Sequence, residues 1–419
     1  MAIGQAKASR GPTSLTEEAR LSGEFADWNN LILDVAWLTG ELNIGALRDA
    51  WWRVCLRHDA MRRAYVSPDE ACTHAEPLSE VEFHTAETDA EALELMRRIL
   101  GVPFDLYDHG LSRIVIVRRD DRRHLVGIVL DHIITDEISW TQLLLGMAAF
   151  YRRALERDVS DITEASTYHS FASLQRREFD GPWGKTRREF WQSHTAEFGP
   201  YPPPFSARGE IGGTPSFKAL DLELSADVVS EFARRARATP FVVIASGVLA
   251  AMQEVTGDSP VGLVTEDHGR MVPGTSRTVG LFVQTVPLRL TRRTKDPVET
   301  VREVFLRSLD VFEYSLPFRV SGNRWQENLV SPGGKPGVHL QVHDRTFPRV
   351  GWLAGTVTEN VRLEVPGGHP DTSQTIQFEG HLIGTRPRLV ATYNENLYSG
   401  AVIEQMLRLA VEFMSSGVN

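Results

Sequence analysis

Residues 125–140 read LVGIVLDHIITDEISW and decide which fold we expect. The unbroken apolar run at residues 125–130 predicts a β-strand that is buried on both faces. From residue 138 onward the apolar side chains follow helical spacing, which predicts a helix over residues 138–155. The turn between them places acidic side chains around one histidine. A strand, a polar turn and a helix in succession are typical of α/β proteins, in which ligands bind near strand ends.

Two of the residues in this turn are candidates for chemistry. His132 carries the side chain best able to take or give a proton near neutral pH. Asp136, four residues later, can bind a cation or an arginine and hold the turn rigid. The same spacing also fits an ordinary strand-to-helix turn, in which Asp136 caps the helix and His132 is a hydrogen-bonded strand-end residue. The spacing alone leaves both interpretations open.

The composition excludes several classes of function. The chain has 419 residues and a net charge of −10, which argues against broad contact with nucleic-acid phosphates, although an acidic partner could dock on a local basic patch. With only Cys55 and Cys72, neither a disulfide framework nor a cysteine zinc site is expected. The N-terminal residues lack the apolar core of a signal peptide, and no apolar run reaches the roughly 20 residues of a membrane helix. We expect a soluble cytoplasmic monomer that binds neither nucleic acid nor membranes.

The chain is long enough for two halves of similar size. Proline and glycine cluster at residues 181–184 and 199–204, which predicts a linker. We therefore expect one α/β subdomain over residues 1–178 and a second over residues 179–419. The expected helices cover residues 44–57, 91–100, 138–155, 186–198, 225–236, 239–256, 297–315 and 399–416. The expected strands cover residues 111–118, 124–130, 261–265, 280–290, 337–343, 375–382 and 388–394.

Residues 131–137 resemble the HHxxxDG motif of the condensation domains of nonribosomal peptide synthetases, members of the chloramphenicol-acetyltransferase-like superfamily. Other segments resemble further motifs of that family, in the family's order. These are LRHDAMR at 56–62 (RHxxLR), PFDL at 103–106 with GLSR at 110–113 (PFDL…GPLxR), YHSFA at 168–172 (YxDYA), FW at 190–191 (yW), GLFVQTVPLR at 280–289 (GxFVNTLPLR) and YNENLY at 393–398 (YNxDLF). Together they span nearly the whole chain.

The resemblance implies a fold and a reaction. The fold is a V-shaped pseudo-dimer of two acetyltransferase-like subdomains with a central tunnel. The substrates are an acyl or peptidyl donor and an acceptor, delivered on the phosphopantetheine arms of peptidyl or aminoacyl carrier proteins, with no cofactor bound directly. His132 matches the histidine that accepts or positions the proton of the attacking amine or hydroxyl. Asp136 matches a structural aspartate, for which Arg62 is the expected partner because an unpaired buried carboxylate is costly.

The motif departs from the family at two positions. Asp131 replaces the first histidine, a supporting residue, and so need not abolish activity. Glu137 replaces a glycine, where its bulk and charge would disfavour a nearby oxyanion or would recognise a cationic amine. Alternatively, Glu137 points to solvent and stabilises the start of the helix. Asp131, Asp136 and Ser139 also fit the DxxxxDxxS pattern of heterocyclization domains.

The remaining candidates have smaller roles. We expect Ser139, Trp140, Tyr168 and Gln284 to line the tunnel or contact substrate, with Gln284 in place of the family's asparagine, and Arg289 to give structural support. The segment EDHGR at 266–270 resembles a metal cluster, but no second histidine lies at ligand spacing, so a loop against the motif-bearing half is favoured. His339 and His343 lie on one face of a predicted strand without an HExxH context. No metal site is therefore predicted.

Three functions remain open. The first is a condensation enzyme that uses His132 to form an amide or ester bond. The second is a catalytically degenerate condensation fold that recruits a carrier protein or a tailoring enzyme. The third is a heterocyclization enzyme that uses Asp131 and Asp136. Retention of His132 favours catalysis, and the initial methionine with its polar lead-in favours a freestanding protein.

Overall fold

The computed structural model describes residues 9–22, 31–79, 81–107, 110–156, 167–194, 216–257, 260–270, 272–316, 337–343, 353, 355–363, 375–383 and 386–418. The chain divides into two compact units. Unit 1 consists of Met1–Gly181, Arg270–Val283 and Phe347–Pro370, and unit 2 consists of Pro182–Gly269, Gln284–Thr346 and Asp371–Asn419. The first boundary lies three residues beyond the predicted one, and two later segments return to unit 1, whereas we expected two continuous subdomains.

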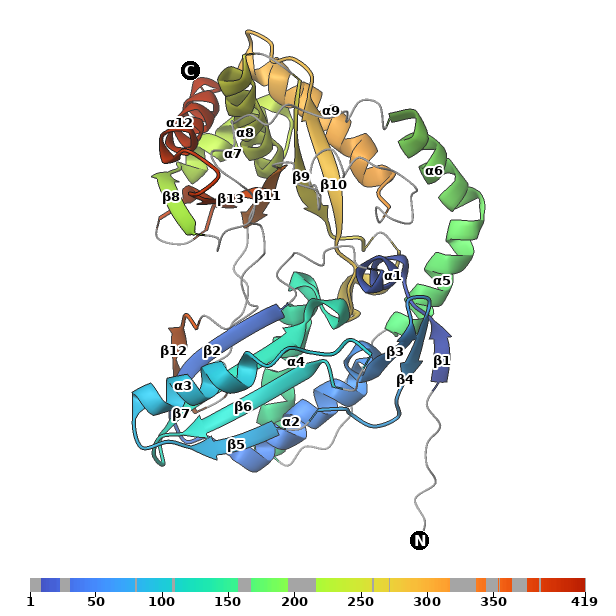
Figure 1. Ribbon diagram of the computed structural model, residues 1–419, viewed down its shortest axis with the longest axis vertical. Helices are drawn as coiled ribbons and strands as arrows, with labels where there is room; N and C mark the ends of the chain where they lie inside the picture. Colours follow the sequence, from blue (N-terminus) through green and yellow to red (C-terminus); the bar gives the residue numbers. More distant parts are fainter. Residues whose placement is uncertain are drawn as a thin grey trace. The chain divides into compact units, whose positions relative to one another are not determined.

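Unit 1 is built on a five-stranded mixed sheet with the order β12-β2-β7-β6-β5 (Figure 1). Of the strand pairs described in this sheet, β5 and β6 are parallel and the others are antiparallel. The edge strand β12 comes from the far end of the chain and pairs with β2 from Thr356↔Gly40 to Val361↔Val35. The strands are β2 (Leu31–Gly40), β5 (Val81–Thr85), β6 (Ser112–Arg118), β7 (Arg123–Asp131) and β12 (Thr356–Val361).

Both faces of this sheet are buried, because side chains alternate along each strand and each set meets a helix. On one face α3 (Asp89–Leu100) packs with residues such as Val115 and Leu125. On the other, α2 (Ile44–Arg57) and α4 (Glu137–Glu156) pack with residues such as Ile116 and Val126. Figure 1 shows α3 and the α2–α4 pair on opposite sides of the sheet. The prediction of a doubly buried strand before the motif is confirmed.

A smaller part of unit 1 supports the motif. It contains an antiparallel sheet with the order β1-β4-β3. Ser14 and Glu17 form a capping box at the start of α1, so that both side chains satisfy backbone groups that the helix leaves unpaired. The elements are β1 (Ser9–Pro12), α1 (Leu15–Leu21), η1 (Asp59–Arg62), β3 (Arg63–Ser67), β4 (Glu70–Thr73) and α5 (Tyr168–Asp180).

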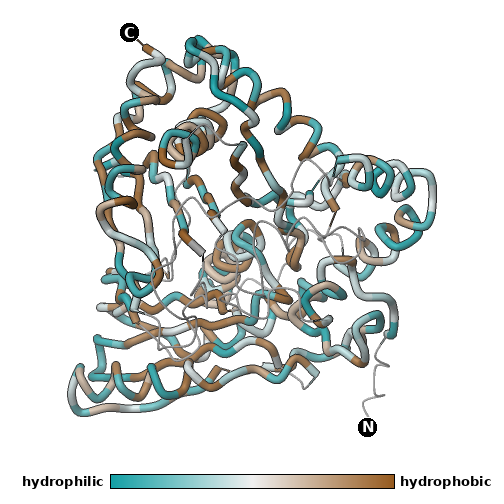
Figure 2. The backbone as a smooth tube through the Cα atoms, turned by 45° about the horizontal axis from the view of Figure 1, so that its top comes forward, coloured by the Kyte–Doolittle hydropathy of each residue, from teal (hydrophilic) through white to brown (hydrophobic). Residues whose placement is uncertain are grey.

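Unit 2 is built on a six-stranded mixed sheet with the order β10-β9-β11-β13-β14-β8. The most deeply buried helix is α8, which begins after Thr239 as N-cap and Pro240 in its first turn. Figure 2 shows the helices at the surface alternating between hydrophobic and hydrophilic residues along the chain. The strands are β8 (Phe217–Glu223), β9 (Val261–Asp267), β10 (Gln284–Leu290), β11 (Gly337–His343), β13 (Thr375–His381) and β14 (Arg388–Asn394). The helices are α6 (Pro182–His194), α7 (Ala226–Ala236), α8 (Pro240–Thr256), α9 (Pro297–Glu313) and α12 (Gly400–Ser416).

The predicted α/β class is confirmed in both units. One strand prediction was wrong in its start, because residues 280–283 belong to unit 1 and β10 begins only at Gln284. The first part of the predicted linker was wrong, because residues 182–184 begin α6, where proline suits the first helical position. The second part at 199–204 and the expected helix end at 195–198 lie outside the described residues. The V-shaped arrangement and the tunnel stay predictions. Among the described residues no single helix is long and apolar enough to cross a membrane, although the bent pair α7–α8 passes on length and composition alone.

Candidate functional site

The motif loop, which we define as residues 131–137, connects β7 to α4. Asp131 ends β7, a short 3-10 turn follows at His132–Ile134, and Glu137 begins α4. Two buried carboxylates, Asp131 and Asp136, stand at the two ends of the turn, and half-buried His132 lies between them. The loop is thus a short turn with an anchor at each end.

Asp131 is the first anchor. One of its carboxylate oxygens accepts a hydrogen bond from the Ile133 backbone N–H at 2.9 Å, which caps the 3-10 turn. The other oxygen lies 3.6 Å from the guanidinium of Arg20 in α1. Burial raises the pKa of Asp131, while the Arg20 charge and the Ile133 N–H act in the opposite direction. At the position where the motif resemblance would place a histidine, this chain therefore has a capping, ion-paired carboxylate.

Asp136 is the second anchor, and it is held from three directions. It caps α4 by accepting the Ser139 backbone N–H at 2.7 Å. Its two oxygens lie 2.8 and 3.0 Å from Nη2 of Arg270, in a buried ion pair. It also accepts the Phe282 backbone N–H at 3.1 Å. The capping role predicted as one interpretation is present, and it coexists with a charged partner.

The predicted partner of Asp136 was wrong. Arg62 instead donates hydrogen bonds to backbone carbonyls, including those of Cys55 at 3.0 Å and Leu56 at 3.2 Å. These two carbonyls lie in the last turn of α2, where helical partners are missing. Arg270 takes the place that we expected for Arg62, because residues 270–283 belong to unit 1.

Ser139 and Gly280 join α4 to the segment 270–283. The Ser139 hydroxyl donates to the Gly280 carbonyl at 2.9 Å and accepts from the Gly280 N–H at 3.1 Å. It also accepts from Arg270 at 2.8 Å. Gly280 has a φ of +156°, and a Cβ built there would lie 2.0 Å from the Tyr168 ring. Only glycine fits this contact.

Tyr168 is a buried structural residue beside the site. Its hydroxyl donates to the Leu281 carbonyl at 2.5 Å and lies 2.9 Å from the Ser14 hydroxyl. Its ring meets that of Phe282 edge to face, with centroids 5.1 Å apart. Burial raises the pKa of this hydroxyl well above its ordinary value. The tyrosine is therefore a neutral hydrogen-bond donor that fixes the start of the GLFVQ stretch.

His132 differs from Asp131 and Asp136, whose carboxylates form caps and ion pairs. None of the described residues forms a hydrogen bond with its ring, although the ring lies close enough to Asp131 to affect that carboxyl. Glu137 is exposed in the first turn of α4, where a negative charge stabilises the helix. Trp140 is buried among the core residues of unit 1. The solvent-facing alternative for Glu137 agrees with this exposure.

Gln284 and Arg289 lie on β10 in unit 2. The Gln284 amide donates to Asp267 at 3.1 Å and to the Ser315 hydroxyl at 2.6 Å. Arg289 pairs in register with Gly262 of β9. Within unit 1 the structure brings together His132, the capping residues Asp131 and Asp136, and Ser139, whose N–H Asp136 caps. Glu137 and Trp140 lie at the start of the same helix.

Sequence reasoning missed Arg270, Arg20 and Gly280 as members of this site. The expected loop at 266–270 was the one signal for Arg270, since we expected that loop to meet the motif-bearing half. Arg270 does so, as the first residue of the segment that returns to unit 1. No sequence pattern pointed to Arg20, whose role depends on the unusual Asp131.

Among the described residues, one group of side chains has the donor set of a metal site. It consists of His343 on β11 and Glu379 and His381 on β13. The interpretation of His339 and His343 as one-face residues agrees with the β11–β13 register. The other two donors, Glu379 and His381, were missed because they come from a different strand.

Comparison with known proteins points to one family. The sequence model of the Condensation domain family matches residues 32–319. The PF 1022-synthetase of Rosellinia sp. is 26% identical over 72% of this chain, and the cyclosporin synthetase of Tolypocladium inflatum is 25% identical over 92%. The chain spans only 10% and 3% of the length of these two relatives.

A solved structure shares the fold. The condensation domain from the monacolin K polyketide synthase MokA has a TM-score of 0.76 at 15% identity and covers 98% of both chains. At this identity the likeness concerns the fold alone.

Proposed function

The chain belongs to the condensation-domain family, whose members are acyltransferases in general, and from that premise we propose that it joins a carrier-bound acyl or peptidyl thioester to an acceptor amine or hydroxyl by using His132. One observation supports this most. The two aspartates of the motif loop are committed to caps and ion pairs, while the half-buried His132 ring has no hydrogen bond among the described residues.

The proposed reaction requires one proton acceptor. The acceptor nitrogen attacks the thioester carbonyl carbon, a C–N bond forms and the C–S bond breaks. The proton leaves the nitrogen for the His132 imidazole, and the departing thiolate of the phosphopantetheine arm then takes a proton to become a thiol. Imidazole is suited to this step because its ordinary pKa lies near neutrality. With a hydroxyl acceptor the same transfers give an ester.

The anchors would serve this step by positioning. His132 follows Asp131 directly and lies four residues before Asp136, so the two caps fix the backbone on both sides of the histidine. A loop with fixed ends holds its side chain near one orientation, which lowers the entropic cost of reaching the reactive geometry. Asp131, Asp136 and Ser139 are therefore proposed as positioning residues.

The same contacts argue against heterocyclization. Heterocyclization would require Asp131 or Asp136 to exchange a proton with the substrate as an acid or a base. Asp136 already accepts four hydrogen bonds, and Asp131 bonds Ile133 and faces Arg20. Ser139 is equally occupied by Gly280 and Arg270. We infer that the DxxxxDxxS pattern here marks a structural brace.

The second candidate function is a scaffold that binds partner proteins without catalysis. It is favoured by the presence of Glu137 where the motif resemblance expects a glycine. The matched structures include the X-domain from teicoplanin biosynthesis and a complex of that X-domain with OxyB, so this fold also occurs in a partner-binding domain. A carboxylate in place of glycine would disfavour a developing oxyanion nearby. We rank this second, because Glu137 is exposed at the start of α4.

A transfer assay separates the candidates. The full chain is incubated with an acyl-loaded carrier protein and an aminoacyl-loaded carrier protein, and the products are identified by mass spectrometry. Amide formed by the wild type and lost in a folded His132→Ala variant supports the enzyme. No turnover in the wild type together with turnover in Glu137→Gly supports the scaffold. A ring-closed, dehydrated product that depends on Asp131 supports heterocyclization.

A further inference from the structure

One face of the unit 2 sheet carries an unusual set of polar side chains. Strands β11 and β13 run parallel and in register, with His339 opposite Gln377, Gln341 opposite Glu379 and His343 opposite His381. Alternation along the strands places all six on one face. The intervening residues Val338, Leu340, Ile376 and Phe378 are buried on the other face. The sheet therefore has an apolar side and a side rich in histidine, glutamine and glutamate.

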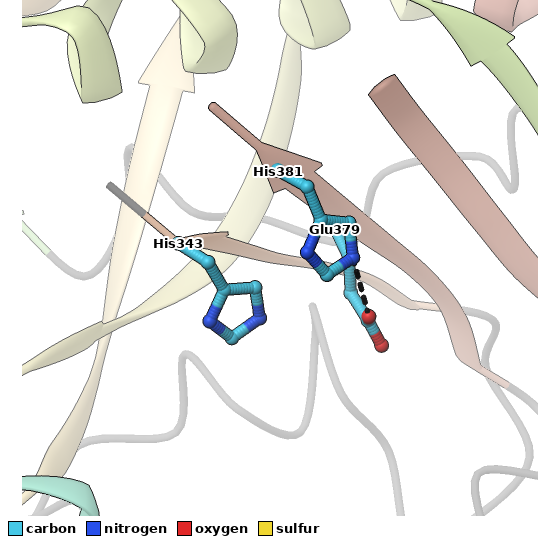
Figure 3. A group of neighbouring side chains, drawn as sticks. All are labelled: His343, Glu379 and His381. Atoms are coloured by element: carbon cyan, nitrogen blue, oxygen red, sulfur yellow. Dashed lines mark hydrogen bonds and ion pairs between the residues drawn. The ribbon is translucent and has the colours of Figure 1, made fainter. Parts of the chain in front are cut away.

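Three of these residues converge at the ends of the two strands, as Figure 3 shows. The rings of His343 and His381 stack with centroids 4.9 Å apart and an interplanar angle of 17°. Nε2 of His381 lies 3.2 Å from Oε2 of Glu379. One ligand atom from each of the three residues lies within 4.8 Å of the others, and all three side chains are partly exposed.

The donor atoms of this group suit a metal. Imidazole nitrogens and a carboxylate oxygen are ligand types that divalent transition metals take in proteins. The stacked rings of His343 and His381 come from neighbouring strands that are held in register, so both rings can present a nitrogen to one ion.

We propose that His343, Glu379 and His381 bind one divalent transition metal ion, with zinc as the best match. Two imidazoles and one carboxylate are a donor set that zinc accepts, with bonds of about 2.0–2.2 Å and a fourth position left for water or another ligand. Tetrahedral ligand atoms at that bond length lie roughly 3.3 Å apart. Side-chain rotations can close the present separations, since both strands are already fixed in register.

A neighbouring side chain supports the carboxylate. The Gln377 amide donates to the Glu379 oxygen that does not face His381, at 3.2 Å. Contacts of this kind orient metal-binding carboxylates and tune the site. The ion would therefore tie the ends of β11 and β13 together at a preoriented glutamate. Binding of the ion requires no acyl transfer and uses none of the residues of the motif loop.

The test measures zinc binding directly. The full chain is treated with a chelator, dialysed and titrated with Zn²⁺ by calorimetry, and Co²⁺ is added separately to record the absorption bands of the bound ion. We expect one equivalent to bind. Each of His343→Gln, His381→Gln and Glu379→Gln should weaken binding at least about tenfold. The matched control is His84→Gln, because His84 also lies beside one glutamate, Glu82 at 3.4 Å, but without a second histidine in that ion pair.

Thermal unfolding adds a second readout. Zinc should raise the unfolding temperature of the wild type and of His84→Gln in a concentration-dependent way, since an ion that binds only the folded state stabilises it. The double variant His343→Gln/His381→Gln should lose this shift while unfolding cooperatively. Equal zinc affinity in the wild type and the double variant would overturn the proposal, and so would the absence of stoichiometric binding to the wild type.

Discussion

The Ser139 hydroxyl bonds both the N–H and the carbonyl of Gly280, which lies 141 residues further along the chain. This contact ties the start of α4 to the segment that also supplies Arg270 and Phe282 to Asp136. The backbone conformation around His132 thus depends on contacts with residues of unit 1 that lie far along the chain. Disruption at Gly280 should therefore reach the motif loop.

Gly280→Ala should be strongly destabilising. Its positive φ disfavours any Cβ, and that Cβ would overlap the Tyr168 ring. We expect a loss of about 2–4 kcal/mol in the free energy of unfolding from strain and overpacking together. Gly257→Ala is the control, because Gly257 has a φ of +73° but a Cβ added there would meet nothing within 4 Å. It should cost about 1 kcal/mol. Equal losses in urea titrations would contradict the close-packing explanation.

The partner of Asp136 can be identified by double-mutant cycles. Asp136→Asn and Arg270→Gln should couple by about 1–3 kcal/mol, because the two side chains form a buried pair. Asp136→Asn and Arg62→Gln should be additive within about 0.5 kcal/mol. The measurement is the unfolding free energy of each single and double variant. Strong coupling to Arg62 and none to Arg270 would show that the observed pairing is wrong.

His58 should make unit 1 sensitive to acid. Burial lowers its pKa from 6.5 to about 3, with a smaller contribution from Arg57. Below pH 6.5 the unfolded chain binds a proton at His58, whereas the folded chain keeps the imidazole neutral down to about pH 3. The free energy of unfolding is therefore highest above pH 6.5 and decreases as the pH falls toward 3. Between pH 6.5 and about 5 the expected loss is about 2 kcal/mol.

Comparison of two histidine variants isolates this effect. His58→Gln should flatten the pH dependence of stability over that interval, whereas His84→Gln, at a partly exposed site on β5, should leave it unchanged. If the wild type and His58→Gln lose stability in parallel over the same interval, the buried neutral imidazole is not the cause.

Glu137→Gly should change catalysis by less than His132→Ala does. Glu137 is exposed at the first turn of α4, where the loss of its charge alone costs about a few tenths of a kcal/mol of helix stabilisation. We expect kcat for amide formation to stay within about tenfold of the wild type, a change of about 1.4 kcal/mol in barrier. A gain of a hundredfold or more would mean that the carboxylate obstructs the reaction, as the scaffold alternative requires.

Local sequence patterns predicted the helices and strands, but they did not predict contacts between segments that are far apart in the sequence. The helical spacing at 44–57 and the apolar run before the motif correspond closely to α2 and β7, because burial of a helix face or a strand leaves a short-range signature. The partner of β2 at the sheet edge was not predictable in this way. It is β12, whose residues TVTENV are largely polar and lie far along the chain.

In the candidate site, too, the residues of the local motif were predicted and their distant partners were not. The motif placed His132 and Asp136 on a strand-to-helix turn, and the structure has them there. The arginine could not be chosen from sequence, since Arg62 lay in a recognisable segment while Arg270 is 134 residues from Asp136. Asp131 forms an ion pair with Arg20, and no local sequence pattern predicts this pair. Ion pairs between distant residues depend on the tertiary fold, which the periodicity of the sequence does not reveal.

The role of His132 as proton acceptor is tested by comparing two neighbouring residues in one assay. Single-turnover amide formation between loaded carrier proteins is measured for the wild type, His132→Ala and Asp131→Asn, each shown to be folded by its unfolding transition. If His132 handles the proton, His132→Ala should lose about 10²–10⁴-fold in rate. Asp131→Asn should stay within about tenfold, since Asp131 acts by capping and pairing. Full activity in His132→Ala, or greater loss in Asp131→Asn than in His132→Ala, would show that His132 is not the proton acceptor.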